Sequence, residues 1–492
     1  MVISRAYARG RLRVFKLRRL ALAVAVAASG CGLLAGAESP SISPRELFRL
    51  GGIEDHQLEE LDRGEPWHEA DRQVLRNMLY RIAQDVRPID LEHWSHGEPN
   101  FDLLAEQPQA YRAEVFELRG VVEHIEPYEL ADNPKERGAF SMLWRCRLRL
   151  EQGGLVEVFS AKRPRAWKPN EAIAEPAGAM AFFLGHRSSE ARNSRAVFLA
   201  ARMAWYPSTY LGQLGMDVGL LDDVPVQPPP KRNKRGDASE IDWQSRRLTA
   251  VDHECFYQML AAAGRAAPGE LSRWAKEGLA RQQRTEYSVV PLFNEPHLQQ
   301  GKLVELTGIA KRILPVRVGE PEVIERFGID QYYQVYLFTA DSQDNPLVFC
   351  LRRLPKGLPI GDGPEFGEVL TVPGFFFKTW SYRNATPATE GKVERQLAPL
   401  LIGDSAVWHP RRAPAGSPAE RLIGTVLLLG ILAAAWLVLR RFKKGDREFE
   451  RRVWRRRPAE MSEIEWDRFG ETPSEGSADK APPGASGSTN GG

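Results

Sequence analysis

The apolar positions between residues 74 and 82 follow the spacing of a helix. Val74, Leu75, Met78, Leu79 and Ile82 fall at i, i+1, i+4, i+5 and i+8, which places them on one helical face. Beyond residue 115 the period changes to two, as in a strand with one buried and one solvated face. We therefore expect a helical lead-in followed by five strands, over residues 115–125, 144–150, 155–159, 179–184 and 196–205.

The same pattern occurs a second time further along the chain. Residues 103–127 and 291–315 align without a gap and share identities that include Leu104 with Leu292, Glu117 with Glu305 and Gly120 with Gly308. Asp71-x6-Met78-Leu79 recurs as Asp252-x6-Met259-Leu260, and Trp205-Tyr206-Pro207 recurs as Trp408-His409-Pro410. A period this long, of about 150 to 170 residues, indicates a duplicated domain and not a short solenoid repeat.

The second copy repeats the order of elements. Helical spacing covers residues 252–263 and about 268–282, and strand patterns follow at 302–313, 332–339, 346–353, 368–378 and 396–408. Residues 224–236 (VPVQPPPKRNKRG) are proline-rich and then basic, a composition typical of an extended linker. We expect a first unit at 43–221, a linker at 222–241 and a second unit at 242–410.

A helical lead-in and five strands, the first long and carrying a central glycine, resemble the oligonucleotide/oligosaccharide-binding (OB) fold. In that small barrel a glycine or bulge lets the first strand bend, and Gly120 or Gly308 would serve this purpose. The chain is also similar to uncharacterised bacterial membrane-anchored proteins with duplicated OB-like domains. The expected fold class is α+β, with two tandem units of helices and a five-stranded OB-like barrel, followed by one transmembrane helix. A split sandwich would satisfy the same strand count.

Both ends of the chain carry targeting patterns. Seven basic residues precede an apolar run at 20–34, so residues 1–37 read as an export signal. A twin-arginine signal at Arg18-Arg19, a lipoprotein signal at Cys31 and an uncleaved anchor remain open alternatives. Residues 422–439 lack any charge and are followed by Arg440, Arg441, Lys443 and Lys444. This predicts a single membrane span with the duplicated domains outside the cytoplasm.

The segment after the predicted span has two parts. Residues 440–457 hold ten basic and three acidic residues and are expected to lie against anionic lipid headgroups. The remainder of the tail, up to residue 492, is acidic and of low complexity, so it is not expected to fold by itself.

Charge argues against nucleic acid as a partner. The whole chain carries +3, of which residues 1–37 contribute +7 and residues 440–492 contribute 12 basic and 10 acidic groups, so residues 38–439 carry −6. Binding to a phosphate backbone needs a field of the opposite sign.

The sequence shows no catalytic constellation and no cofactor or metal motif. His93-x2-His96 lacks a carboxylate or cysteine at ligand spacing, and His68-Glu69 and His253-Glu254 lack a second histidine four residues later. Gly361-Asp362-Gly363 precedes a strand, whereas phosphate-binding loops precede a helix. Cys146, Cys255 and Cys350 are expected to be small buried residues, although a Cys146–Cys350 or Cys255–Cys350 disulfide is open.

The most unusual local composition is PGFFFKTWSY at 373–382. Alternation sends only half of these side chains into a core, so the other aromatic residues need different cover or stay exposed. One interpretation is a groove for a sugar or peptide, and the other is packing against the lead-in helices. The expected groove residues are Arg352, Arg353, Lys356, Phe376, Lys378, Trp380 and Tyr382.

The sequence therefore predicts a single-pass envelope protein whose duplicated outer domains bind or scaffold an envelope protein or a glycan. Duplication favours this function because tandem copies supply avidity without a reaction centre. The alternatives are an enzyme that acts on an extracytoplasmic polymer through carboxylates, and a binder of single-stranded nucleic acid.

Overall fold

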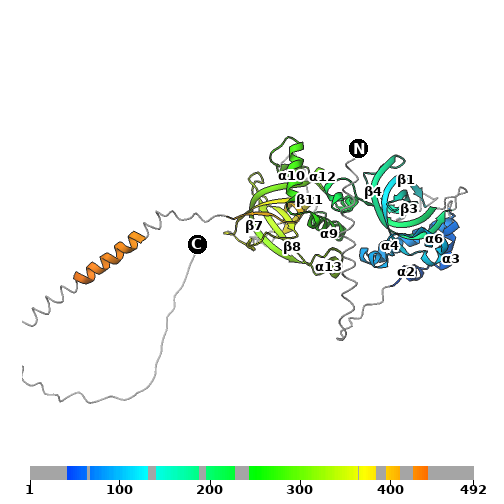
Figure 1. The fold of residues 1–492 in the computed structure, drawn as a ribbon, viewed down its shortest axis with the longest axis horizontal. Coiled ribbons are helices and arrows are strands. Elements are labelled where there is room, and N and C mark those ends of the chain that lie inside the picture. Colours follow the sequence, from blue (N-terminus) through cyan, green and yellow to red (C-terminus); the bar gives the residue numbers. More distant parts are fainter. Residues whose placement is uncertain are drawn as a thin grey trace, which may run out of the picture. The chain divides into compact units, whose positions relative to one another are not determined.

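The computed structural model describes residues 42–63, 67–130, 140–187, 195–227, 243–363, 365–383, 395–410 and 425–441 (Figure 1). Residues 1–411 form one compact unit and residues 412–492 form another. The predicted export signal at 1–37 lies outside the described residues, as does the basic and acidic tail beyond Arg441.

Two tandem β-sheet domains follow one another within the first unit, each preceded by helices. The first has α2 (Pro44–Leu50), α3 (Asp55–Glu60), η1 (Leu61–Arg63), α4 (Glu69–Asp85), α5 (Pro88–Trp94), α6 (Phe101–Glu106) and α7 (Pro108–Tyr111) before its strands. Those strands are β1 (Val115–Glu129), β2 (Met142–Leu150), β3 (Leu155–Lys162), β4 (Ala172–Arg187), β5 (Arg195–Arg202) and β6 (Ala204–Trp205).

A short helical segment, α8 (Tyr210–Gln213) and η3 (Val218–Asp223), comes next. The second domain has α9 (Ala250–Arg265), α10 (Glu270–Arg281), α11 (Val290–Asn294), α12 (Pro296–Gln299) and α13 (Pro321–Phe327). Its strands are β7 (Leu303–Arg317), β8 (Gln331–Phe338), β9 (Leu347–Leu351), β10 (Gly361–Asp362), β11 (Glu368–Arg383), β12 (Arg395–Gly403) and β13 (Val407–His409).

The two sheets share one topology. The first runs β1-β2-β3-β5-β4-β6 and the second runs β10-β7-β8-β9-β12-β11-β13. Additional pairings of β1 with β4 and of β7 with β11 close five strands of each sheet into a ring. In both copies one neighbouring pair, β3 with β5 or β9 with β12, is parallel. The repeated order shows that the duplicated sequence codes for a duplicated sheet.

The predicted fold class of two five-stranded OB-like barrels with a transmembrane helix is wrong, because the sheets contain six and seven strands. The segments 196–205 and 396–408 were each expected to form one strand, but each is interrupted. At the interruption the backbone bonds elsewhere, since the Met203 N–H donates to the Lys162 carbonyl and the Arg353 N–H donates to the Asp404 carbonyl. The short strand β10, paired with Ile313 and Arg312 of β7, was not predicted as a strand.

The transmembrane prediction for 422–439 is also wrong. In the described part of the chain, no helix combines the length and the apolar character needed to cross a bilayer. The helix in this region covers 17 residues, 425–441, and its last two are Arg440 and Arg441 (orange in Figure 1). The predicted single-pass localisation rested on this span and is wrong with it.

A glycine near the middle of the first long strand is required in both copies. A Cβ at Gly120 would collide with the Arg149 carbonyl oxygen, and a Cβ at Gly308 would collide with the Phe338 carbonyl oxygen. The register of each strand then shifts within four residues, between Val122 and His124 and between Ala310 and Arg312. The glycine lets the neighbouring strand approach closely while the bulge bends the long strand, so it can pair on both sides.

Substituting Gly308 by alanine is expected to destabilise the second domain by about 1 to 3 kcal/mol, because the added methyl group forces β7 and β8 apart. Urea unfolding followed by tryptophan fluorescence measures this loss. Gly278→Ala in α10 is the matched control, since a Cβ there meets nothing within 4 Å. The free energy of unfolding of that variant is expected to rise by about 0.5 to 1 kcal/mol, because alanine is a better helix former than glycine. Equal effects at both positions would contradict the steric explanation.

The other repeated residues fix the helices and the chain ends to the sheets. The His68 N–H donates to Asp71 Oδ2 and the Thr249 N–H donates to Asp252 Oδ2, so the Asp repeated in each copy caps the first long helix. The Trp205 indole N–H donates to Glu175, and the Trp408 indole N–H donates to Glu368. The sequence echoes outside the aligned segment therefore mark equivalent contacts in both domains.

Candidate functional site

The residues expected to form one groove lie in three different places. Phe376 faces the interior of the second ring and is fully buried in a core with Leu306, Phe349 and Leu401. Phe375 and Phe377 face the opposite way and pack in another core with Phe256 of α9. A register shift between Phe376 and Lys378 puts two successive side chains on this helical side. The lead-in helix thus supplies the cover that the aromatic run needs.

Lys378 forms an ion pair inside the protein. Its side chain has no exposed surface, and Nζ lies 3.1 Å from both carboxylate oxygens of Asp252. The ammonium group also donates to the carbonyl oxygens of Ser245 at 3.3 Å and Arg247 at 3.2 Å. Burial lowers the pKa of Lys378, and the charge of Asp252 opposes that shift. Lys378 therefore anchors the start of the second domain to β11 and is not accessible to a ligand.

Trp380 and Tyr382 lie on the same side of β11 as Lys378 and are partly buried against the helix-side core. Their ring centroids are 5.7 Å apart, and Tyr382 lies 5.8 Å from Tyr336. The Tyr382 hydroxyl hydrogen-bonds Gln396 Oε1 at 2.7 Å, and burial raises the pKa of Tyr382 to about 12. These two aromatic residues lie together on the helix-facing side of β11.

Of the three basic groove residues, Arg352 lies at the other end of α9. Arg352 packs on Gly264 near the end of that helix and donates to the Gly328 carbonyl at 2.6 Å. Arg353 pairs with Asp404 at 2.6 Å, and Lys356 is exposed. Twelve residues separate Asp252 from Gly264, so the ends of the helix near Lys378 and Arg352 are about 18 Å apart. The seven residues do not line one groove.

The structure instead brings together residues at the junction of the two domains. The segment that follows β6 lies in the core of the second domain. Leu211, Leu214, Met216, Leu220, Leu221 and Val224 are all buried in one cluster with the apolar face of α9, which includes Phe256, Met259 and Leu260. This cluster continues to the outer face of the second sheet through Phe375 and Phe377. The chain that leaves the first domain is therefore part of the hydrophobic core of the second.

Polar contacts hold that segment to both domains. Asp217 accepts a hydrogen bond from the Trp205 N–H at 2.8 Å and pairs with Arg202 at 3.2 Å, both in the first domain. The Asp217 N–H donates to Gln258 of α9 at 3.3 Å, and the Arg265 side chain donates to the Leu214 carbonyl at 2.6 Å. Burial raises the pKa of Asp217, while Arg202 and two backbone N–H groups oppose the shift. Asp217 thus connects β6 of the first sheet to the lead-in helix of the second.

Aromatic stacking adds a third type of contact at the same place. Tyr210 of α8 lies parallel to Trp274 of α10, with ring centroids 4.8 Å apart and an interplanar angle of 9°. The Tyr210 hydroxyl donates to the Trp274 carbonyl at 3.3 Å. The segment is therefore fixed against α10 as well as α9.

The chain on either side of the proline-rich basic segment contacts the second domain. At its start, Val224 is buried in the core with α9. After it, the carbonyl oxygens of Arg246 and Trp243 accept hydrogen bonds from Ser381 of β11. The Ser381 N–H donates to Arg246 at 2.9 Å, and the Ser381 hydroxyl donates to Trp243 at 3.3 Å. The residues between, 228–242, lie outside the described residues. Because both attachment points belong to one domain, the change from first to second domain occurs before this segment.

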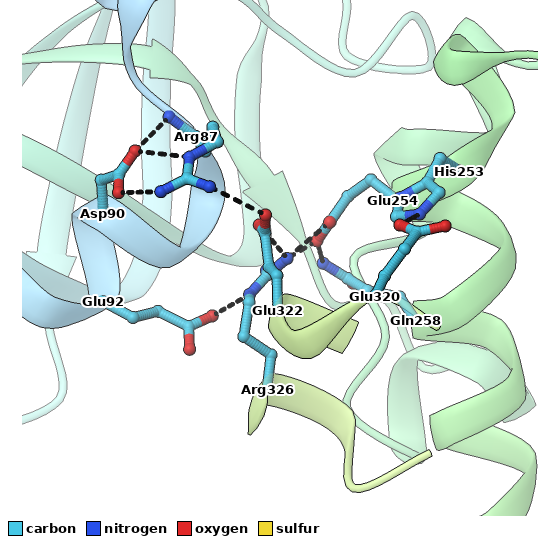
Figure 2. Close-up of polar contacts among 9 residues, drawn as sticks. All are labelled: Arg87, Asp90, Glu92, His253, Glu254, Gln258, Glu320, Glu322 and Arg326. Carbon is cyan, nitrogen blue, oxygen red and sulfur yellow. Dashed lines mark hydrogen bonds and ion pairs between the residues drawn. The ribbon is translucent and has the colours of Figure 1, made fainter. Parts of the chain in front are cut away.

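An ionic contact joins the two domains at a second place (Figure 2). Arg326 of α13 is 7% exposed and donates two hydrogen bonds, at 2.7 and 2.8 Å, to the carboxylate of Glu254 in α9. Its Nε donates to Glu92 of α5, in the first domain, at 2.8 Å. A planar guanidinium suits this arrangement because it can serve two carboxylates at fixed angles.

Further charged pairs surround Arg326. Arg87 of the first domain is bound to Asp90 and lies 3.9 Å from Glu322 of α13. His93 Nε2 lies 2.8 Å from Glu325, and His253 Nε2 lies 2.5 Å from Glu320. Burial alone would lower the pKa of Arg326, but hydrogen bonds and charge attraction from Glu254 and Glu92 raise it above its usual value.

The pKa of Glu254, the partner of Arg326, is shifted in the opposite direction. Its partial burial would raise its pKa, but the hydrogen bonds and charge of Arg326 lower it below the usual value. A carboxyl group with a lowered pKa contributes stability that is present above its unfolded value, near 4.3, and is lost as the pH falls through the lowered value. The Arg326–Glu254 pair therefore stays intact at neutral and mildly acidic pH.

The other sequence motifs have structural positions. His93 and His96 do not share a ligand site, because His93 pairs with Glu325 whereas His96 pairs with Glu114. No cluster of three or more metal-binding side chains occurs among the residues that the structure describes. Gly361 and Asp362 form strand β10. Cys146, Cys255 and Cys350 are buried free thiols, and burial raises their pKa values.

Neither any protein-family model nor any curated protein matches the chain.

Sequence reasoning missed both parts of the junction. Arg326 and Glu92 are 234 residues apart in the chain, so no local pattern connects them. The segment 210–224, most of which was assigned to the end of the first unit, did carry a signal, since its six apolar residues within 15 positions require cover from a core.

Proposed function

We propose that the protein is a two-domain scaffold or binding module in which the duplicated domains act as one body. The observation that carries this proposal is that the apolar side chains between Leu211 and Val224, which follow the first sheet, are buried in the core of the second domain. A hydrophobic core shared across a domain boundary opposes independent movement, because separation would expose that apolar surface to water. Two similar domains held in this way present two surfaces at a constant spacing, which favours bivalent binding.

The proposed partner is a protein or a glycan. The net charge of −6 over residues 38–439 disfavours single-stranded nucleic acid, which needs a basic surface. At low salt, the chain is expected not to shift single-stranded DNA in a gel. A shift that disappears with added salt would support the nucleic-acid alternative.

Cutting the chain within residues 228–242 is expected to leave the two domains associated. The attachments at both ends of this segment belong to the second domain, so the cut severs no connection between the cores. A protease recognition sequence inserted between Pro230 and Lys231 allows one specific cut in the full chain. Size-exclusion chromatography in native buffer should then give one peak with both fragments. Two separate peaks would contradict the proposal.

A matched pair of variants checks which contact holds the fragments together. Leu220→Asp places a charge in the shared core and should let the fragments separate after the cut. Leu298→Asp changes a leucine that is 53% exposed and should leave one peak. Separation in both variants, or in neither, would show that the shared core is not what joins the domains.

A further inference from the structure

Trp380 and Tyr382 form an aromatic surface near the end of β11. They are two positions apart on one strand, so their side chains lie side by side on the same face. Their rings are tilted by 32° with 5.7 Å between centroids, and both residues are partly exposed. Tyr336 of β8 is only 9% exposed and packs edge-on against Tyr382, with 5.8 Å between centroids. A buried third ring therefore supports the two outer ones.

Polar groups border these rings. The Tyr382 hydroxyl donates to Gln396 Oε1 at 2.7 Å, which leaves the Gln396 NH2 group able to donate to a ligand. The Arg312 guanidinium lies over the Tyr336 ring, 5.4 Å from its centroid, and the Arg312 side chain is 34% exposed. Arg312 also lies 3.5 Å from Asp362, so the charges of these two side chains balance. The surface therefore combines ring faces with neutral hydrogen-bonding groups.

The first domain fills the matching part of its sheet with ions. By the registers of the aligned strands, Arg147 takes the place of Tyr336, and Glu157 takes the place of Val348. Glu157 is 1% exposed and pairs with Arg145 at 3.0 Å. Because the same sheet forms with ions at these positions, the fold does not require aromatic residues there. The aromatic surface is a property of the second domain.

An extended peptide finds no strand edge to pair with at this place. On one side β11 pairs with β12, where Tyr382 lies opposite Gln396. On the other side the Ser381 N–H donates to the Arg246 carbonyl at 2.9 Å. Because both edges of β11 are occupied here, a peptide cannot add as a further strand. A ligand must bind through the side chains.

We propose that Trp380, Tyr382 and Gln396 bind a neutral glycan. The proposal rests on the scaffold function, since it names the partner of the second domain. Sugar rings have apolar C–H faces that pack on aromatic rings, and their hydroxyl groups both donate and accept, which matches the Gln396 amide and the Tyr382 hydroxyl. Because Arg312 is paired with Asp362, a neutral glycan fits this surface better than an anionic one.

Isothermal titration calorimetry of the full-length chain with chitohexaose and cellohexaose tests the proposal. Both probes are soluble neutral oligomers of β-linked sugars, and at least one should bind. Trp380→Ala should weaken binding about tenfold, as when an aromatic anchor of a binding surface is truncated. Gln396→Ala removes one hydrogen-bonding group and should weaken it about twofold to tenfold. Arg147→Ala, at the matching position of the first domain, should leave the affinity unchanged.

Absence of binding to both oligomers would overturn the glycan assignment, as would an equal loss of affinity in Trp380→Ala and Arg147→Ala. Tighter binding of anionic polygalacturonate than of either neutral oligomer would also overturn it. Circular dichroism melting checks that each variant is folded, and Gln396→Ala decides the outcome if Trp380→Ala does not fold. Failure of the glycan site leaves one peak in the cutting experiment, whereas failure of the scaffold gives two.

Discussion

Replacing Lys378 by alanine is expected to lower the free energy of unfolding by about 3 to 5 kcal/mol, because Asp252 then becomes a buried charge without its ion-pair partner. Neither side chain of the pair is more than 1% exposed. The substitution also leaves the Ser245 and Arg247 carbonyl oxygens without the hydrogen bonds that the ammonium group donates. Urea unfolding of the full chain, followed by fluorescence and circular dichroism, measures the change.

Two further variants separate the ion pair from side-chain size. Lys378→Met combined with Asp252→Leu replaces the pair with apolar side chains, and most of the lost stability should return. About 1 kcal/mol should stay lost, because Asp252 also caps α9. Arg273→Ala removes an exposed pair with Glu270 and should change stability by less than about 1 kcal/mol. A similar small effect for Lys378→Ala would contradict the assignment of a buried charge pair.

Phe376→Ala is expected to destabilise the second domain by about 3 to 5 kcal/mol through loss of buried apolar surface and formation of a cavity. Phe376 is fully buried in the interior of the ring that β7, β8, β9, β12 and β11 form. The surrounding strands are joined on both sides, so they cannot collapse easily into the space. Thermal and urea unfolding both report the loss.

Phe183 is the matched position in the first domain. It is fully buried in the core of the first ring, and it pairs with Phe198 of β5 as Phe376 pairs with Leu401 of β12. Phe183→Ala should therefore lower the stability of the first domain by a similar free energy. Phe338→Ala, at a partly exposed position, should cost clearly less than either. If Phe376→Ala instead weakened binding of a ligand without a loss of stability, the groove interpretation of this residue would be favoured.

The strand pattern was readable in the sequence because it depends on alternation along one segment. The expected strands at 115–125 and 302–313 correspond to β1 and β7, although both strands extend further. The interruptions at Met203 and Asp404 were not readable, because they arise where the backbone bonds to a different part of the chain. Each interruption adds one strand to the expected five, and the unpredicted β10 makes the second sheet seven-stranded.

The aromatic run at 373–382 illustrates the same limit at a candidate site. Alternation correctly required that Phe376 and its neighbours point in opposite directions. It could not say that α9 covers Phe375 and Phe377, nor that Asp252 of that helix neutralises Lys378. Arg352, placed in the same groove by proximity in sequence, lies near the far end of α9, and Arg353 pairs with Asp404.

The sequence by itself determined the duplication, the helix and strand periods, and the glycine that each long first strand needs. These properties are local or repeated, so a single chain displays them directly. Only the tertiary structure decided that residues 211–224 belong to the second domain's core, and that Arg326 pairs with a carboxylate 234 positions away. Periodicity specifies which side chains share a face, whereas the surface that covers the face is chosen by packing among distant segments.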